Sequence, residues 1–169
     1  MDLITLIDDN DNVIGFDEKL KVHIEGKLHR AFSIFITNHN HEILLQKRNL
    51  QKYHSGGLWS NSCCGHPNYD ETIERASHKR LIEEFGFECS LSYLYKFRYK
   101  TSFANSLIEN EIDYVFWGCC DKIPNPNPQE ISDWRWVNIS DLGNIIGTDC
   151  FTYWFQKSYK QFVEYYKII

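Results

Sequence analysis

Residues 65–87 read GHPNYDETIERASHKRLIEEFGF, and this stretch decides the fold. It predicts a helix over residues 72–85, because apolar or small side chains recur at helical spacing. These side chains are Ile73, Ala76, Ser77, Leu81 and Phe85. Gly86 is a typical stop signal directly after the helix. The same helix places Arg80 and Glu84 four positions apart, on one face.

Alternating or β-branched segments on both sides of this helix predict strands. They lie at residues 3–7, 31–37, 43–47, 91–100, 107–120 and 134–137. Residues 17–23 suit a short helix or helical turn, and the aromatic-rich residues 151–167 predict a terminal helix. Residues 49–70 predict an irregular loop, and a loop of that length in a compact domain is usually functional. The expected fold is therefore a single α+β domain over residues 1–169, with a mixed β-sheet sandwiched between helices.

The composition suits a folded domain with an apolar ligand pocket. The chain has 169 residues, of which 43% are hydrophobic and 15% aromatic. That length supports one full core, and the surplus of rings is typical of a pocket lining. The net charge of −5, without a long basic run, argues against a nucleic-acid partner. An anionic ligand would need a local cluster of Lys and Arg.

Cysteine usage predicts a reduced protein. The chain has six cysteines, and four of them form two adjacent pairs, which is a poor layout for a disulfide framework. No CxxC pair is present, which disfavours a structural zinc site. No apolar stretch reaches the ~18 residues that a membrane span needs, and the start MDLI has no basic region. We expect a cytoplasmic monomer without a membrane partner.

The spacing of Gly65, Glu71, Glu83-Glu84 and Gly86 resembles the Nudix box. This loop–helix–loop holds divalent metal on helix carboxylates beside a diphosphate. One position departs from the pattern, because Nudix hydrolases carry Arg-Glu where this chain has Lys79-Arg80. A cation replaces a metal-binding carboxylate, and this argues against hydrolysis by a metal-activated water.

Further segments resemble type I isopentenyl-diphosphate isomerases, a branch of the Nudix fold. They are residues 19–23, 28–33, 58–67 (LWSNSCCGHP), 97–99, 109–114 and 151–155. Their joint order and spacing, from about residue 14 to residue 155, is specific. The resemblance implies a Nudix-like mixed sheet and reversible conversion of isopentenyl diphosphate to dimethylallyl diphosphate in isoprenoid biosynthesis.

That reaction adds a proton to one carbon and removes a proton from the carbon two positions away. It therefore needs an acid and a base at a dry site. The resemblance implies that Cys64 and Glu111 exchange these protons from opposite faces of the alkene. Tyr99 would assist Glu111, and the ring of Trp154 would stabilise transient positive charge. The residues alone leave simpler roles open: a buried thiol for Cys64, and aromatic core for Tyr99 and Trp154.

The spacing of two acids and the family resemblance together predict a metal site. Glu109 and Glu111 are two apart, so on a strand both carboxylates point to one face, and two inward-facing acids are costly without a cation. Two solvated acids on an edge strand are the alternative. The resemblance completes the site with His23, His29 and His66, and also associates Cys64 with the metal. These donors suit Mn²⁺, Zn²⁺ or Mg²⁺. We expect the remaining histidines to be surface or core residues: His39, His41, His54 and His78.

The resemblance also implies a diphosphate site. Glu84 would hold a Mg²⁺ ion that bridges to the diphosphate. Four cations would grip the diphosphate itself: Lys19, Arg48, Lys52 and Arg80. The plain alternative for Arg80 and Glu84 is an ion pair along the helix.

Two other functions compete with the isomerase. One is a Nudix hydrolase of a nucleoside or prenyl diphosphate, which the Lys79-Arg80 departure disfavours. The other is a non-catalytic Nudix-like binding module. Such modules usually lack the metal carboxylates and nucleophiles, whereas this chain has all four: Cys64, Glu84, Glu109 and Glu111.

Overall fold

The computed structural model describes residues 2–147 and 150–168 of the chain. Within them, a mixed sheet of nine strands is accompanied by four α-helices and one 3-10 turn. The strands are β1 (Leu3–Ile7), β2 (Val13–Glu18), β3 (His29–Thr37), β4 (Glu42–Arg48), β5 (Trp59–Ser60), β6 (Cys63–Gly65), β7 (Ser92–Ser102), β8 (Ile108–Cys119) and β9 (Ile131–Asn138). The helical elements are α1 (Lys19–Glu25), α2 (Ile73–Phe85), η1 (Ile139–Asp141), α3 (Leu142–Ile145) and α4 (Tyr153–Tyr166).

Strand β3 is the centre of the sheet. It pairs in parallel with β8 along its whole length, from His29 opposite Glu111 to Thr37 opposite Cys119. The other paired strands are antiparallel, including β7 on β8, β9 on β4 and β6 on β3. The sheet is therefore mixed, as predicted.

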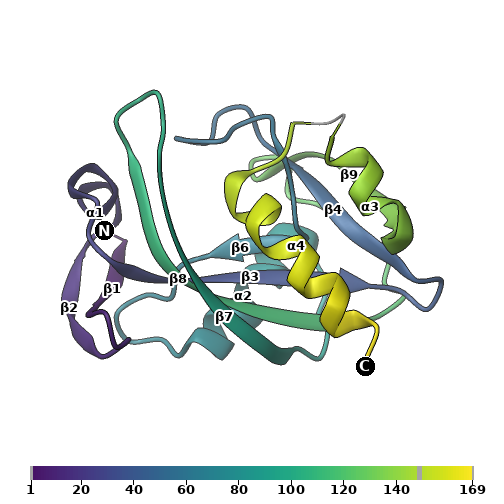
Figure 1. Ribbon diagram of the computed structural model, residues 1–169, viewed down its shortest axis with the longest axis horizontal. Helices are drawn as coiled ribbons and strands as arrows, with labels where there is room; N and C mark the ends of the chain where they lie inside the picture. Colours follow the sequence, from purple (N-terminus) through teal and green to yellow (C-terminus); the bar gives the residue numbers. More distant parts are fainter. Residues whose placement is uncertain (1, 148–149, 169) are drawn as a thin grey trace.

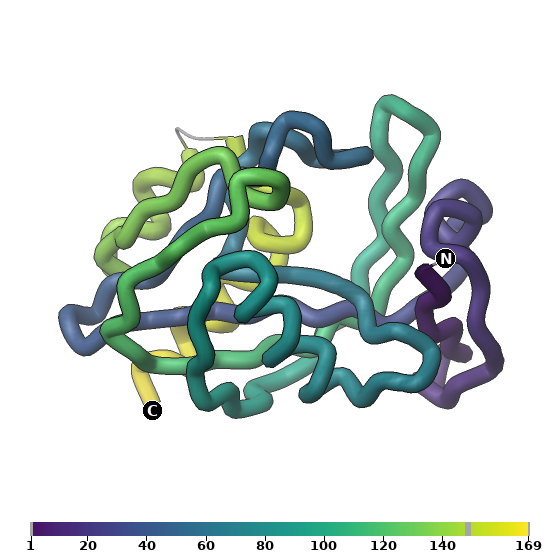
Figure 2. Tube along the Cα trace, turned by 180° about the vertical axis from the view of Figure 1, so that it is seen from behind, coloured from purple at the N-terminus to yellow at the C-terminus, as the bar shows by residue number. Residues whose placement is uncertain are grey.

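Helices cover both faces of the sheet. Helix α4 lies on one face (Figure 1), and α2 lies on the other, which Figure 2 shows from behind. Successive strand side chains point to opposite faces, so β3 supplies two cores. Phe32, Ile34 and Ile36 pack in the core that includes α2. Phe35 packs in the core that includes α4. The predicted α+β sandwich is confirmed.

Helix α2 has the ends that its sequence predicts. The side chain of Thr72 accepts a hydrogen bond from the backbone N–H of Arg75 and caps the start of the helix. Gly86 ends it in the left-handed conformation, with φ 71°, which glycine adopts without steric cost. The helix therefore presents its charged side chains at a defined position beside the sheet.

The loop prediction for residues 49–70 was wrong at two places, because β5 and β6 lie within it. These strands are two and three residues long and pair with β4 and β3. Their partners are remote in sequence, so no local periodicity marks them. The pairing places Cys64 opposite Ser33 on β3. The cysteine thus lies on the sheet itself.

Across residues 2–147 and 150–168, none of the helices combines the length and the apolar character that a membrane span requires.

Candidate active site

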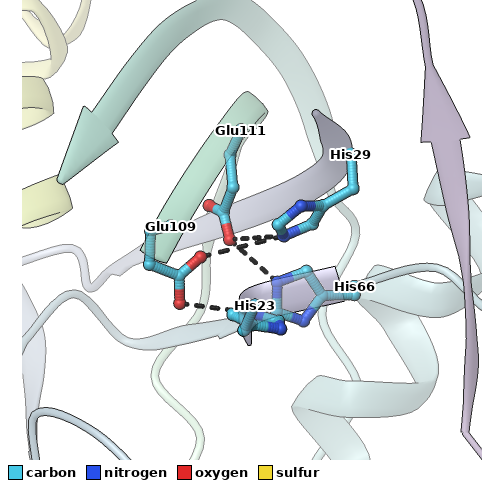
Figure 3. Close-up of side chains that lie close together, drawn as sticks. All are labelled: His23, His29, His66, Glu109 and Glu111. Carbon is cyan, nitrogen blue, oxygen red and sulfur yellow. Dashed lines mark hydrogen bonds and ion pairs between the residues drawn. The ribbon is translucent and has the colours of Figure 1, made fainter. Parts of the chain in front are cut away.

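Five side chains from four places in the fold converge at one end of the sheet (Figure 3). His23 comes from α1, His29 from the start of β3, His66 from the residue after β6, and Glu109 and Glu111 from β8. Each offers one ligand atom, and these atoms all lie within 4.8 Å of one another. The parallel register of β3 and β8 places His29 directly opposite Glu111. This is the cluster that the sequence predicted as a metal site.

Backbone contacts orient two of the imidazoles. His23 Nδ1 lies 2.6 Å from the carbonyl oxygen of Lys19, and His29 Nδ1 lies 2.8 Å from that of Lys27. A proton on each Nδ1 satisfies these contacts and leaves the lone pair of Nε2 available to bind a metal ion. That arrangement is typical of metal-binding histidines.

The electrostatics of the cluster fit a bound cation. Burial and the neighbouring Glu111 raise the pKa of Glu109 to about 8. Burial opposes charge on Glu111 too, yet its contacts with Glu109, His29 and His66 hold its pKa well below the ordinary value. His23 Nε2 and Glu109 Oε2 are buried without a hydrogen-bond partner. A divalent ion ligated by imidazole and carboxylate would satisfy these atoms and offset both acids.

A cavity of about 360 Å³ adjoins the cluster, and Cys64, Tyr99, Glu111 and Trp154 all line it. The Tyr99 hydroxyl donates a hydrogen bond of 2.6 Å to Glu111 Oε2. Burial raises the pKa of the Cys64 thiol to about 12, so it carries its proton at neutral pH. The Arg48 guanidinium lies 5.2 Å from the centre of the Trp154 ring, so the ring face already accepts a cation.

The four predicted phosphate-binding cations line the same cavity: Lys19, Arg48, Lys52 and Arg80. Arg80 also makes the predicted helix ion pair, with Nη2 2.7 Å from Glu84 Oε1. Glu84 is buried, and its Oε2 accepts a hydrogen bond of 2.8 Å from Gln46. Arg80 therefore forms the ion pair with Glu84 and lines the cavity at the same time.

Comparison with known proteins identifies the family. The model of the NUDIX domain matches residues 27–156. A protein of Photorhabdus laumondii named "Isopentenyl-diphosphate Delta-isomerase 2" is 46% identical, over 99% of each chain. The chain belongs to the isopentenyl-diphosphate Delta-isomerase family. A Pectobacterium atrosepticum protein of the same family is 39% identical, over 97% of this chain and 93% of its own.

Solved structures support the fold of this isomerase family member. A Deinococcus radiodurans protein superposes with a TM-score of 0.76 at 21% identity, over 96% of this chain and 97% of its own. The MutT protein of Methanosarcina mazei superposes with a TM-score of 0.69 at 19% identity, over 83% of this chain and 96% of its own. At such identities the likeness shows the Nudix fold alone.

The structure brings the predicted residues of this isomerase family member together. Ten of them line the cavity: Lys19, Arg48, Lys52, Cys64, His66, Arg80, Tyr99, Glu109, Glu111 and Trp154. His23 and His29 complete the metal-type cluster, and Glu84 adjoins the cavity through Arg80.

His54 lies at the cavity, although the sequence reasoning expected only a surface or core histidine. It is buried and lines the cavity, and its Nε2 lies 2.6 Å from Glu109 Oε1. Burial and the charge of Arg48 lower its pKa to about 3, so the ring is neutral. His54 lies in the segment between β4 and β5, where no periodicity indicates which side chains face inward. By contrast, His39 is exposed, as expected, and pairs with Asp121.

Asp113 and Glu130 are acids at the cavity that the sequence reasoning did not assign to the site. Asp113 lines the cavity, accepts a hydrogen bond of 2.7 Å from Ser33 Oγ, and has its pKa raised by burial. Asp113 is two residues after Glu111, so strand alternation could have predicted that both side chains point to the same face. Glu130 also lines the cavity and contacts Lys52 and Arg80. No local pattern connects Glu130 with them, because its partners are 78 and 50 residues away.

Proposed function

We propose that this protein interconverts isopentenyl diphosphate and dimethylallyl diphosphate by protonation and deprotonation. The observation that carries the proposal is that the Cys64 thiol and the Glu111 carboxyl line one cavity. Membership in the isomerase family, over nearly the whole chain, supports the same substrate. A cavity of about 360 Å³ has room for a five-carbon diphosphate.

The proton transfers need groups in complementary states. Cys64 carries a proton at neutral pH, because burial raises its pKa to about 12. Glu111 is ionised, and the Tyr99 hydroxyl holds one of its oxygens. A protonated thiol and an ionised carboxylate around one alkene can deliver one proton and accept the other, with the roles exchanged in the reverse direction.

The intermediate between the two transfers carries positive charge on carbon. The Trp154 ring contributes its negative face at the cavity, where it already meets the Arg48 guanidinium. Tyr99, Glu111 and Trp154 are buried, which limits the access of water to such a cation. Trp154 would therefore lower the energy of the carbocation-like state.

Metal ions complete the proposal. His23, His29, His66, Glu109 and Glu111 would hold one divalent ion, Mn²⁺ or Zn²⁺, close to Cys64. Glu84 would hold Mg²⁺ together with the substrate diphosphate. Bound ions supply positive charge that offsets the buried carboxylates and the diphosphate. The cations Lys19, Arg48, Lys52 and Arg80 would bind phosphate oxygens within an otherwise acidic chain.

The setting of the enzyme is part of the same proposal. We infer a cytoplasmic monomer that takes a small prenyl diphosphate and neither nucleic acid nor membrane as its partner. Its six cysteines are free, which suits a reducing compartment.

Incubation with isopentenyl diphosphate and Mg²⁺ in deuterated water tests the proposed reaction. Mass spectrometry should find deuterium in the dimethylallyl diphosphate product, because a proton from the protein enters the carbon skeleton. A parallel incubation with ADP-ribose tests the rival hydrolase. Rapid cleavage of ADP-ribose to AMP and ribose 5-phosphate, without any dimethylallyl product from isopentenyl diphosphate, would contradict the isomerase.

A further inference from the structure

Glu130 joins two of the cations that line the cavity. Its Oε2 atom lies 2.5 Å from Arg80 Nη2 and also contacts Lys52 Nζ. Arg80 projects from α2, Lys52 follows β4, and Glu130 precedes β9. One carboxylate oxygen therefore links charged groups from three separate parts of the fold.

The backbone strengthens this link. The N–H of Asn49 donates a hydrogen bond of 2.9 Å to the carbonyl of Glu130, and the N–H of Lys52 donates one of 3.2 Å to the carbonyl of Asn49. Asn49 Nδ2 donates a further bond of 2.6 Å to the carbonyl of Pro128. The segment that carries Lys52 is thus held on the segment that carries Glu130.

Like charges make such a link necessary. Lys19, Lys52 and Arg80 line one cavity, and burial and the charges of Arg80 and Lys52 lower the pKa of Lys19. Glu130 is partly buried between Lys52 and Arg80 and contacts both. Without its negative charge, the two side chains would repel each other and move apart.

We infer that Glu130 is a positioning residue for diphosphate binding. It holds Lys52 and Arg80 side by side, so that both reach the same anion without first being brought together. This role deepens the proposed function and rests on it, because it assigns Lys52 and Arg80 to the substrate diphosphate. Glu130 itself acts only through these two cations.

Inorganic pyrophosphate with Mg²⁺ is the direct probe, measured by calorimetry on the metal-loaded full chain. Glu130→Gln removes the charge but keeps the size of the side chain. We expect pyrophosphate binding about tenfold weaker, the loss that follows when a charge-assisted contact disappears. The KM for isopentenyl diphosphate should rise by a similar factor, with kcat changed less than about twofold, since uniform binding is what is lost.

Glu74→Gln is the matched control. Glu74 lies on the same helix as Arg80, but it is exposed and is not among the described residues that line the cavity. Pyrophosphate affinity should remain unchanged in this variant. Glu130→Asp is the second variant, which keeps the charge and should bind better than Glu130→Gln. Glu130→Asp also tests the inference if Glu130→Gln fails to fold.

A double-mutant cycle tests the action through Lys52. In a Lys52→Ala background, Glu130→Gln should cost less than in the wild type, because one of the two positioned cations is absent. Unchanged or tighter pyrophosphate binding in folded Glu130→Gln would overturn the inference, as would an equal loss in both backgrounds. A failure of the proposed function gives a different result: the wild-type protein would bind pyrophosphate but form no dimethylallyl product.

Discussion

Tyr99 and Glu111 are register partners across β7 and β8, and the tyrosine hydroxyl donates a hydrogen bond of 2.6 Å to Glu111 Oε2. Both groups are buried. Burial and the charge of Glu111 raise the pKa of Tyr99 well above its usual value, so the hydroxyl keeps its proton. Tyr99 therefore acts as a donor that holds one carboxylate oxygen in place at the cavity.

Tyr99→Phe should lower kcat roughly tenfold or more, because a buried hydrogen bond to a charged group is lost. Substrate affinity should change little, since Tyr99 is not among the proposed diphosphate-binding residues. Steady-state kinetics with isopentenyl diphosphate separate the two parameters. An unchanged kcat would show that the bond to Glu111 does not assist the proton transfer.

Cys64→Ala and Glu111→Gln should each reduce kcat by about 10²–10⁴-fold or more, the usual contribution of a positioned acid or base. Far-ultraviolet circular dichroism should remain that of the wild type, because neither change creates a large cavity. Cys63→Ala is the matched control for the thiol, since Cys63 is buried in the α2 core away from the cavity lining. Near-normal turnover of either Cys64→Ala or Glu111→Gln would refute its assigned role.

The His and Glu cluster predicts one tightly bound divalent ion per chain. Elemental analysis of purified protein should find it, and His23→Ala should lower both the metal content and the resistance to chelators. His78→Ala, on the exposed face of α2, should leave the metal content unchanged. Fully active protein without a bound divalent ion would exclude the site.

Asp11 predicts a pH-dependent contribution to stability, away from the cavity. Burial opposes its charge, but hydrogen bonds from Lys96, Tyr114 and Arg30 lower its pKa below 3.8. A carboxyl with a lowered folded-state pKa stabilises the fold above its unfolded pKa, and this stability is lost as the pH falls through the folded value. Asn also tolerates the φ of 65° at this position.

Urea unfolding of Asp11→Asn at several pH values tests this. The variant should be less stable than the wild type at pH 7, and the difference should shrink as the pH falls below about 4. A difference that stays constant down to pH 2 would show that the ionised carboxylate is not the source of the stability.

Phe35→Ala should destabilise the protein by about 3–5 kcal/mol, the usual cost of removing a fully buried aromatic ring. Phe35 is 0% exposed, and its ring centre lies 4.3 Å from that of Phe162 on α4. The free energy of unfolding from urea denaturation measures the loss. A cost below about 1 kcal/mol would mean that α4 does not depend on this contact.

Local patterns predicted the elements that carry the site. Helical spacing and Gly86 located α2 to within one residue of its start, and strand alternation predicted that Glu109 and Glu111 share a face. The family resemblance then selected His23, His29 and His66 among seven histidines. These features depend on neighbours in the sequence or on motifs of fixed order.

Contacts between remote segments could not be predicted in this way. β6 was missed because its partner, β3, lies about thirty residues earlier, and its three residues carry no period of their own. His54 was not assigned to the site although it contacts Glu109, and Glu130 was overlooked although it joins Lys52 to Arg80.

The sequence by itself determined the two-sided sheet, the helices α1, α2 and α4 and the family of the chain, because periodicity and ordered motifs are local properties. Only the tertiary structure decided which buried charges meet. The parallel register of β3 and β8 places His29 beside Glu111, and the packing of three loop and helix segments places Glu130 between two cations. Such pairings depend on how distant segments pack, and side-chain spacing along the chain does not encode them.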